Sequence, residues 1–137
     1  TRALDTLLSA PQRAAWTKVA DAREDYRIAA MAAMTALDLD RRRKLSSEQF
    51  AKVEKLVTQV IRDHLPDIER SMSSPWHLSY YSCLMPLAGV KKADLQAVLT
   101  EKQWKEFQQN DMDDAERYWQ YVEVWRKIRL NPEELNR

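Results

Sequence analysis

The sequence predicts an all-α fold, and three observations lead to this prediction. The 137 residues include a single glycine and five prolines, whereas a β-rich fold needs many glycine-containing turns. Apolar residues recur at intervals of three and four over long stretches, which is the period of one helix face. A short phrase, Leu-Ser/Thr-x-x-Gln, occurs three times, at Leu8–Gln12, Leu45–Gln49 and Leu99–Gln103.

The repeated phrase is a signal for the start of a helix. A Ser or Thr at the N-cap accepts a hydrogen bond from the backbone three residues on, while the Gln side chain reaches back to the N-cap backbone. In two copies the leading Leu is followed five residues later by an aromatic residue, Phe50 or Trp104, as in a hydrophobic staple. We therefore assign structural cap roles to six residues: Ser9, Gln12, Ser46, Gln49, Thr100 and Gln103.

The first phrase opens a helix predicted over residues 10–37, about 40 Å long. One stripe of this helix contains Trp16, Val19, Arg23, Tyr26, Ala30, Ala33 and Leu37. The alanines between 29 and 33 favour a close helix crossing, and the alternative is a binding surface lined by Met31 and Met34. The basic run 41–44 that follows is interpreted as a solvated connector, with anion binding as the alternative.

The second phrase opens a helix predicted over 47–65, which should end or kink at Pro66. Its apolar face contains Phe50, Val53, Val57, Val60, Ile61, His64 and Leu65. The segment 76–87 is dense in aromatic and apolar residues and predicts a short buried helix, with Gly89 at its stop. Residues 93–98 predict one or two further helical turns.

The third phrase opens a last helix predicted over 101–128, which should end before Pro132. Its apolar stripe contains Trp104, Phe107, Ala115, Tyr118, Val122 and Trp125. The expected architecture is a single domain over residues 1–137: an antiparallel bundle of three long helices, with one or two short helices between the second and third. No apolar run is long enough to span a membrane. Because the chain starts at Thr1 rather than Met, we interpret it as a trimmed piece of a longer protein.

Residues that carry chemistry are few and scattered. His64 with Asp63 and Asp67 is the cluster most similar to a metal site, but a structural histidine is the preferred interpretation. Cys83 is alone and lies six residues from His77, and we interpret it as a buried, inert thiol. The acidic stretch Asp111, Asp113, Asp114 and Glu116 lacks the glycine of a calcium loop and is interpreted as a solvated face. We expect no catalytic, metal or cofactor site.

The copies at Leu45–Gln49 and Leu99–Gln103 resemble the signature of the LTXXQ-motif family, the Spy/CpxP-like periplasmic helical proteins, whose members carry two copies. The arrangement is also similar to planctomycete-type helical domains of unassigned function, in which a Gln-Trp pair such as Gln103-Trp104 opens the last helix. A third copy, and the abundance of Trp and Tyr, depart from the LTXXQ pattern. The resemblance implies a periplasmic protein that binds unfolded clients or a membrane sensor.

The expected function is therefore non-enzymatic protein–protein contact in a bacterial envelope compartment, chaperone-like or as a stress sensor or adaptor. The alternative is a structural subunit or interaction domain with no chaperone activity. The candidate partner-binding residues are Trp16, Tyr26, Tyr118 and Trp125. The expected partner is a protein, with a homodimer as one option. A net charge of +1 gives no reason to expect nucleic acid.

Overall fold

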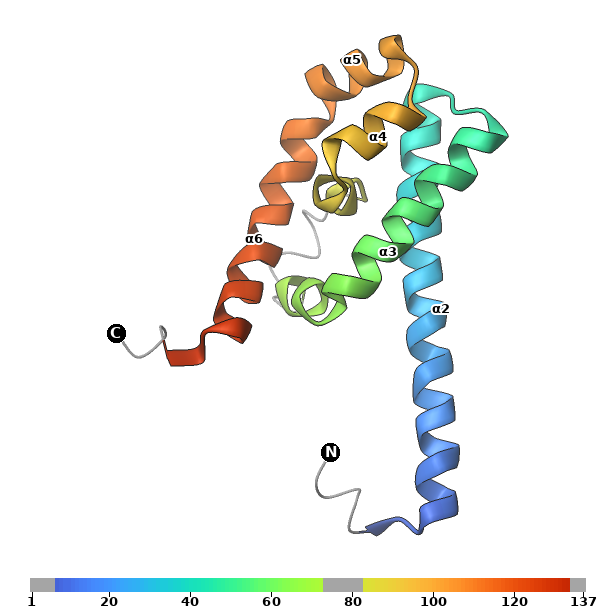
Figure 1. Cartoon of the computed structure of the whole chain (residues 1–137), viewed down its shortest axis with the longest axis vertical. Coiled ribbons are helices and arrows are strands. Elements are labelled where there is room, and N and C mark those ends of the chain that lie inside the picture. Colours follow the sequence, from blue (N-terminus) through green and yellow to red (C-terminus); the bar gives the residue numbers. More distant parts are fainter. Residues whose placement is uncertain (1–6, 73–82, 134–137) are drawn as a thin grey trace.

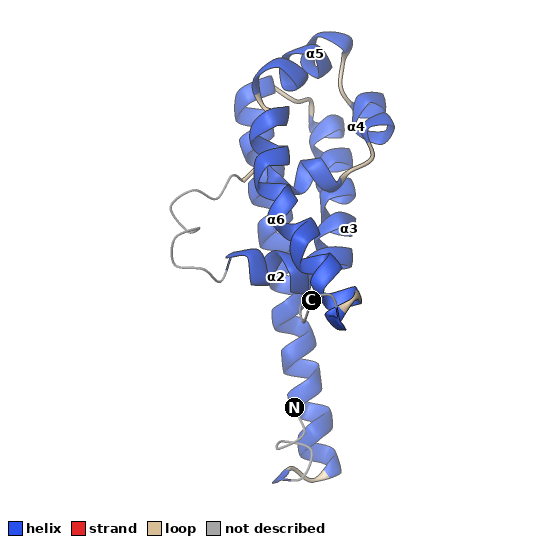
Figure 2. Cartoon of the chain, turned by 90° about the vertical axis from the view of Figure 1, so that its left-hand side faces the viewer, coloured by secondary structure: helices blue, strands red, loops and turns tan. Residues whose placement is uncertain are grey.

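A computed structural model describes residues 7–72 and 83–133, and within these two ranges the chain is helical, without a strand (Figures 1 and 2). The prediction of an all-α fold is confirmed. The elements are α2 (Ala10–Arg43), α3 (Ser47–Met72), the 3₁₀ helix η1 (Met85–Gly89), α4 (Lys92–Val98), α5 (Glu101–Asn110) and α6 (Met112–Leu130).

Helix α3 is the centre of the fold. It packs against α2, with which it forms an antiparallel hairpin, and against α6 and η1 (Figure 1). The hairpin turns at Lys44, whose φ of 55° is left-handed and whose N–H bonds to the carbonyl of Asp40. Helix α5 lies near the C-terminal end of α2, and α6 runs from there along the far side of α3 (Figure 1).

Both of the first two long helices extend beyond their predicted ends. Helix α2 includes Arg41, Arg42 and Arg43 as its last turn, where basic side chains complement the helix dipole. Helix α3 continues through Pro66 to Met72, so it does not end there, and of the two expected outcomes the kink is the one observed. Its C-terminal part runs in a different direction from the rest (Figure 1), as expected when proline removes an interior hydrogen bond.

The last helix is not continuous, as predicted over 101–128, but divides into α5 and α6 at Asp111. Asp111 leaves helical geometry, with φ −122° and ψ −28°, and its side chain is buried. Its carboxylate forms ion pairs with the end of α2, described below, so the point where α5 gives way to α6 is joined to α2. The predicted helix over 76–87 lies largely outside the described residues, and its described end is a turn followed by η1.

The core follows the predicted apolar face of α3 closely. Val53, Val57, Ile61 and Leu65 are buried, and they meet apolar side chains from α2, η1, α4, α5 and α6. Gly89 lies where η1 meets α3 and α6. A Cβ at this position would lie 2.6 Å from the Trp119 ring and from a methyl group of Val60. Close packing is the reason for the glycine, whose φ is not in the left-handed region.

Candidate functional site

The second and third phrases lie side by side and form one hydrogen-bonded unit, which we call the paired caps (Ser46, Gln49, Thr100 and Gln103). In each phrase the Gln Oε1 accepts from the N-cap backbone N–H over 2.9 Å. In each, the N-cap hydroxyl accepts from the Gln backbone N–H, over 3.1 Å at Ser46 and 3.2 Å at Thr100. The two capping boxes predicted from sequence are therefore present.

The two Gln side chains also bond to each other and to the ends of preceding helices. Gln49 Nε2 donates to Gln103 Oε1 over 2.8 Å and to the carbonyl of Val98 over 3.0 Å. Gln103 Nε2 donates to Gln49 Oε1 and to the carbonyls of Arg43 and Lys44. Each amide thus closes one helix start and one helix end, which makes the paired caps a structural joint.

The first phrase has no such partner among the described residues. Gln12 Oε1 accepts from the Ser9 N–H over 2.9 Å, and Arg13 Nη1 donates to the carbonyl of Leu8. These contacts are all local. The phrase lies at the free end of α2, far from the paired caps (Figure 1).

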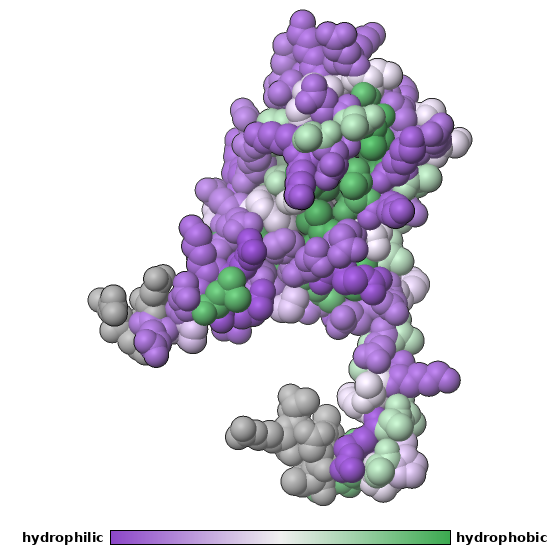
Figure 3. Space-filling model, viewed as in Figure 1, coloured by the Kyte–Doolittle hydropathy of each residue, from purple (hydrophilic) through white to green (hydrophobic). Residues whose placement is uncertain are grey.

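The first half of α2 projects from the body of the molecule, and we call residues 10–27 the α2 arm (Figures 1 and 3). Every residue of the arm is exposed, and Ile28 is the first buried one. Large apolar side chains are exposed along it: Trp16 at 53%, Val19 at 47% and Tyr26 at 75%. On the same part of the arm they are accompanied by Ala15 and Ala20, and by the charged Lys18, Arg23 and Arg27. Trp16 and Tyr26, two predicted partner-binding residues, therefore lie on one accessible surface.

The apolar stripe identified in the sequence is not the one that the body covers. Helix α2 buries a second stripe, formed by Ile28, Ala32, Thr35, Ala36 and Leu39. Two ion pairs fix the base of the arm to α3, between Arg27 and Glu69 at 2.6 Å and between Asp25 and Arg62 at 3.4 Å. The large side chains of the stripe from Trp16 to Leu37 face outward, with Leu37 57% exposed, whereas Ala30 and Ala33 are half-buried. Periodicity alone does not distinguish the two stripes.

The other two candidates, Tyr118 and Trp125, lie elsewhere. Both are on α6, far along the chain from the arm, and both are half-buried. Tyr118 packs against the core, and the Trp125 ring lies 4.8 Å from the guanidinium of Arg70. The structure therefore does not bring the four predicted partner-binding residues together.

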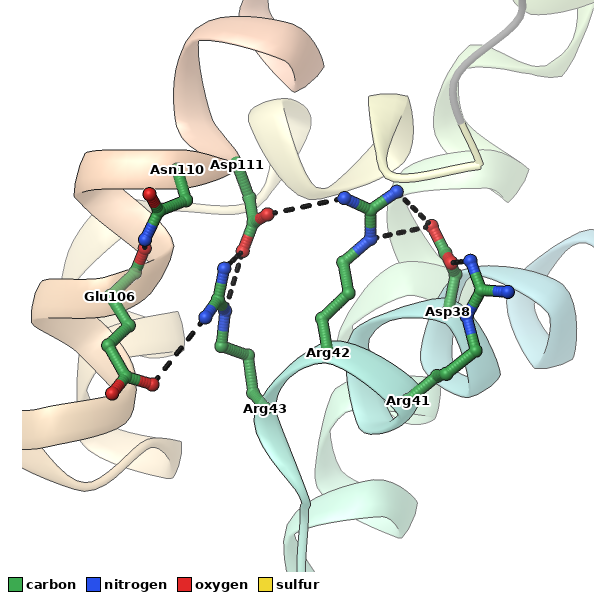
Figure 4. Close-up of polar contacts among 7 residues, drawn as sticks. All are labelled: Asp38, Arg41, Arg42, Arg43, Glu106, Asn110 and Asp111. Atoms are coloured by element: carbon green, nitrogen blue, oxygen red, sulfur yellow. Dashed lines mark hydrogen bonds and ion pairs between the residues drawn. The ribbon is translucent and has the colours of Figure 1, made fainter.

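The basic run 41–44 is only in part the solvated connector we expected: Arg41, Arg42 and Lys44 are exposed, but residues 41–43 belong to α2 and Arg43 is half-buried. Arg43 Nε donates to Asp111 Oδ2 over 2.7 Å, and Arg42 Nη1 contacts Asp111 Oδ1 at 3.4 Å (Figure 4). Arg41 and Arg42 also bond to Asp38 within α2. Asp111 is 1% exposed, so the interpretation of this residue as part of a solvated acidic face is wrong. The signal in the sequence is its position, four residues after Phe107 and four before Ala115, on the buried stripe.

A second buried carboxylate, that of Asp67, also makes a structural contact that was not predicted from the sequence. Asp67 is 2% exposed and accepts two hydrogen bonds of 2.8 Å from Arg129 of α6. These hydrogen bonds hold the pKa of Asp67 below its usual value, although burial opposes the shift. His64 lies edge-on to Trp119, with ring centroids 5.1 Å apart, and its buried Nδ1 has no hydrogen-bond partner among the described residues. Both oxygens of the Asp67 carboxylate are thus bonded to Arg129.

Groups with metal or nucleophile chemistry do not converge in the described part of the chain. Within it, no cluster of three or more His, Cys, Asp or Glu side chains has the arrangement of a metal site. Cys83 is half-buried, burial raises the pKa of its thiol, and its carbonyl accepts a hydrogen bond of 2.7 Å from Thr35. His77, the nearest histidine in sequence, lies outside the described residues. Among the described helices, none combines the length and apolarity needed to cross a membrane.

Comparison with known proteins yields no similarity from which a function can be transferred: no family model, no curated protein and no solved structure matches this chain.

Proposed function

We propose that this chain is a non-enzymatic helical protein that acts by protein–protein contact through the α2 arm. The observation that carries this proposal is the outward apolar stripe of α2, because Trp16, Val19 and Tyr26 are exposed on a helix that leaves the body. Large exposed aromatic residues are characteristic of the centres of protein interfaces. Exposure also costs solubility, so a contiguous apolar stripe on an isolated helix is explained best by a partner.

The compartment and the type of contact come from the resemblance to the LTXXQ-motif family. It supports a periplasmic or other envelope location and a chaperone-like or stress-sensing role. The paired caps are consistent with this resemblance because the two copies that carry it bond directly to each other. The arm supplies a client-binding face, and the body, joined by the paired caps, holds the base of the arm.

The alternative, an interaction domain without chaperone activity, is favoured by the spacing of the stripe. Its members from Trp16 to Leu37 follow intervals of three and four without interruption, with Arg23 as the one charged member. Such a stripe fits one partner helix of defined register, whereas a client-binding surface must accept varied sequences.

Aggregation of reduced insulin, followed by light scattering, tests the chaperone-like role. Suppression at stoichiometric amounts, lost in the double variant Trp16→Glu, Val19→Glu, supports it. The matched control is Val124→Glu, since Val124 is an equally exposed apolar residue on α6. No suppression by the wild-type chain contradicts the chaperone-like role and supports the interaction domain. Equal suppression by the double variant contradicts the role of the arm.

A further inference from the structure

We infer that the partner of the outward stripe of α2 is a second copy of this chain, bound antiparallel along α2. This inference rests on the proposed function only in taking the arm as a protein-binding face. The stripe runs from Trp16 to Leu37, a distance of about 32 Å along the helix. It lies opposite the stripe that α3 covers, so two copies can meet on it with their bodies on opposite sides.

The heptad pattern of the stripe defines the geometry of the contact. Trp16, Arg23, Ala30 and Leu37 are seven residues apart, and so are Val19, Tyr26 and Ala33. These two sets occupy the a and d positions of a coiled coil. The flanking positions Ala15, Ala22 and Ala29 are also seven apart, and such small side chains permit a close approach of a second helix. The pattern therefore fits a two-helix interface.

The distribution of side-chain size along the stripe is complementary to itself in the antiparallel direction. The N-terminal half has the large Trp16 and Val19, and the C-terminal half has Ala30 and Ala33, which are partly open. An antiparallel register centred between residues 24 and 25 places Trp16 and Val19 each opposite an alanine of the partner. In this register the facing pairs are Trp16 with the partner's Ala33, Val19 with the partner's Ala30, and Arg23 with the partner's Tyr26.

Charge favours the same direction. In a parallel, in-register pair Arg23 would face the partner's Arg23 at the centre of an apolar seam, where like charges repel strongly. In the antiparallel register the guanidinium lies against a tyrosine ring instead, as in a cation–π contact, twice by symmetry. A parallel pair would also place Trp16 on the partner's Trp16 and leave two alanine layers underpacked.

The mass of the chain in solution, measured by sedimentation equilibrium over a concentration series, tests the inference. We expect a reversible dimer. Each of Trp16→Glu and Val19→Glu should raise its dissociation constant about ten-fold or more, because each removes a large apolar contact. The control Val124→Glu should leave the constant unchanged. The arm makes few contacts with the body, and circular dichroism checks that each variant remains helical.

Disulfide formation between single-cysteine variants tests the register. In a Cys83→Ser background, Val19→Cys mixed with Ala30→Cys should form a cross-linked dimer on mild oxidation, while Val19→Cys alone should not. Efficient self-linking of Val19→Cys would overturn the antiparallel register, and a wild-type chain that stays monomeric at every concentration would overturn the dimer. A monomer that still suppresses insulin aggregation through the arm would leave the proposed function standing, so the two failures are distinguishable.

Discussion

The side-chain amides of Gln49 and Gln103, 54 positions apart in sequence, donate hydrogen bonds to each other's Oε1 atoms over 2.8 Å and 3.3 Å. Each amide also bonds to the carbonyl end of a preceding helix. A motif that is only a helix cap when considered alone becomes, in two copies, a joint between the α2–α3 turn and the α4–α5 turn. The glutamine side chains that cap two helix starts therefore also join segments that are far apart in the sequence.

The three copies of the phrase allow a comparison between a cap that is part of this joint and a cap that is only local. Gln103→Ala removes a capping contact and the bonds to Gln49, Arg43 and Lys44, so it should lower the free energy of unfolding by about 2 kcal/mol. Gln12→Ala removes only a local cap and should cost about 1 kcal/mol or less. Urea denaturation followed by circular dichroism measures both.

Coupling between the two glutamines gives the second part of this test. Because Gln49 and Gln103 share hydrogen bonds, the double variant should cost less than the sum of the single variants, by about 0.5 kcal/mol or more. Strictly additive costs would contradict a joint and leave two independent caps. The pair Gln12 and Gln49 should be additive, since their phrases are far apart.

The contact of Arg43 with Asp111 predicts a second, larger effect. Arg43→Ala leaves a nearly fully buried carboxylate without its main partner, which should lower the free energy of unfolding by about 3 kcal/mol. Arg41→Ala should change it by less than about 0.5 kcal/mol, because Arg41 is exposed and Asp38 keeps its pair with Arg42. Thermal and urea unfolding of the two variants provide the comparison, and equal losses would refute the importance of burial here.

Gly89→Ala should destabilise the chain although alanine is compatible with the backbone at this position. The added Cβ would lie 2.6 Å from Trp119 and Val60, and overpacking of this kind costs about 1 to 3 kcal/mol. The double variant Gly89→Ala, Val60→Ala removes one of the two clashes and should recover part of the loss. Unchanged stability in Gly89→Ala would show that the glycine is not needed for packing.

Local signals in the sequence predicted the starts of α2, α3 and α5 correctly, because a cap depends on residues three positions apart. The same logic placed the core face of α3, where Val53, Val57 and Ile61 are buried. The break at Asp111 was not predicted, and the main partner of Asp111 is Arg43, 68 positions earlier. Nor does periodicity tell which of the two apolar stripes of α2 the body covers, since both follow the helical repeat. Both the break at Asp111 and the buried stripe of α2 depend on contacts between segments far apart in the sequence.

The pair between Asp67 and Arg129 predicts how stability responds to acid. The folded pKa of Asp67 lies below its value in the unfolded chain, which is about 4. Ionised Asp67 therefore contributes stability above that unfolded pKa, and the contribution is lost as the pH falls through the folded pKa. Asp67→Asn should be less stable than the wild type at pH 7, and the difference should shrink below about pH 4. The free energy of unfolding, measured at a series of pH values, gives this difference directly.

Glu48→Gln is the matched control, because Glu48 is an exposed carboxylate paired with Lys52 and its substitution should change stability little. A difference for Asp67→Asn that stays constant from pH 7 to pH 3 would show that the ionised pair is not its source.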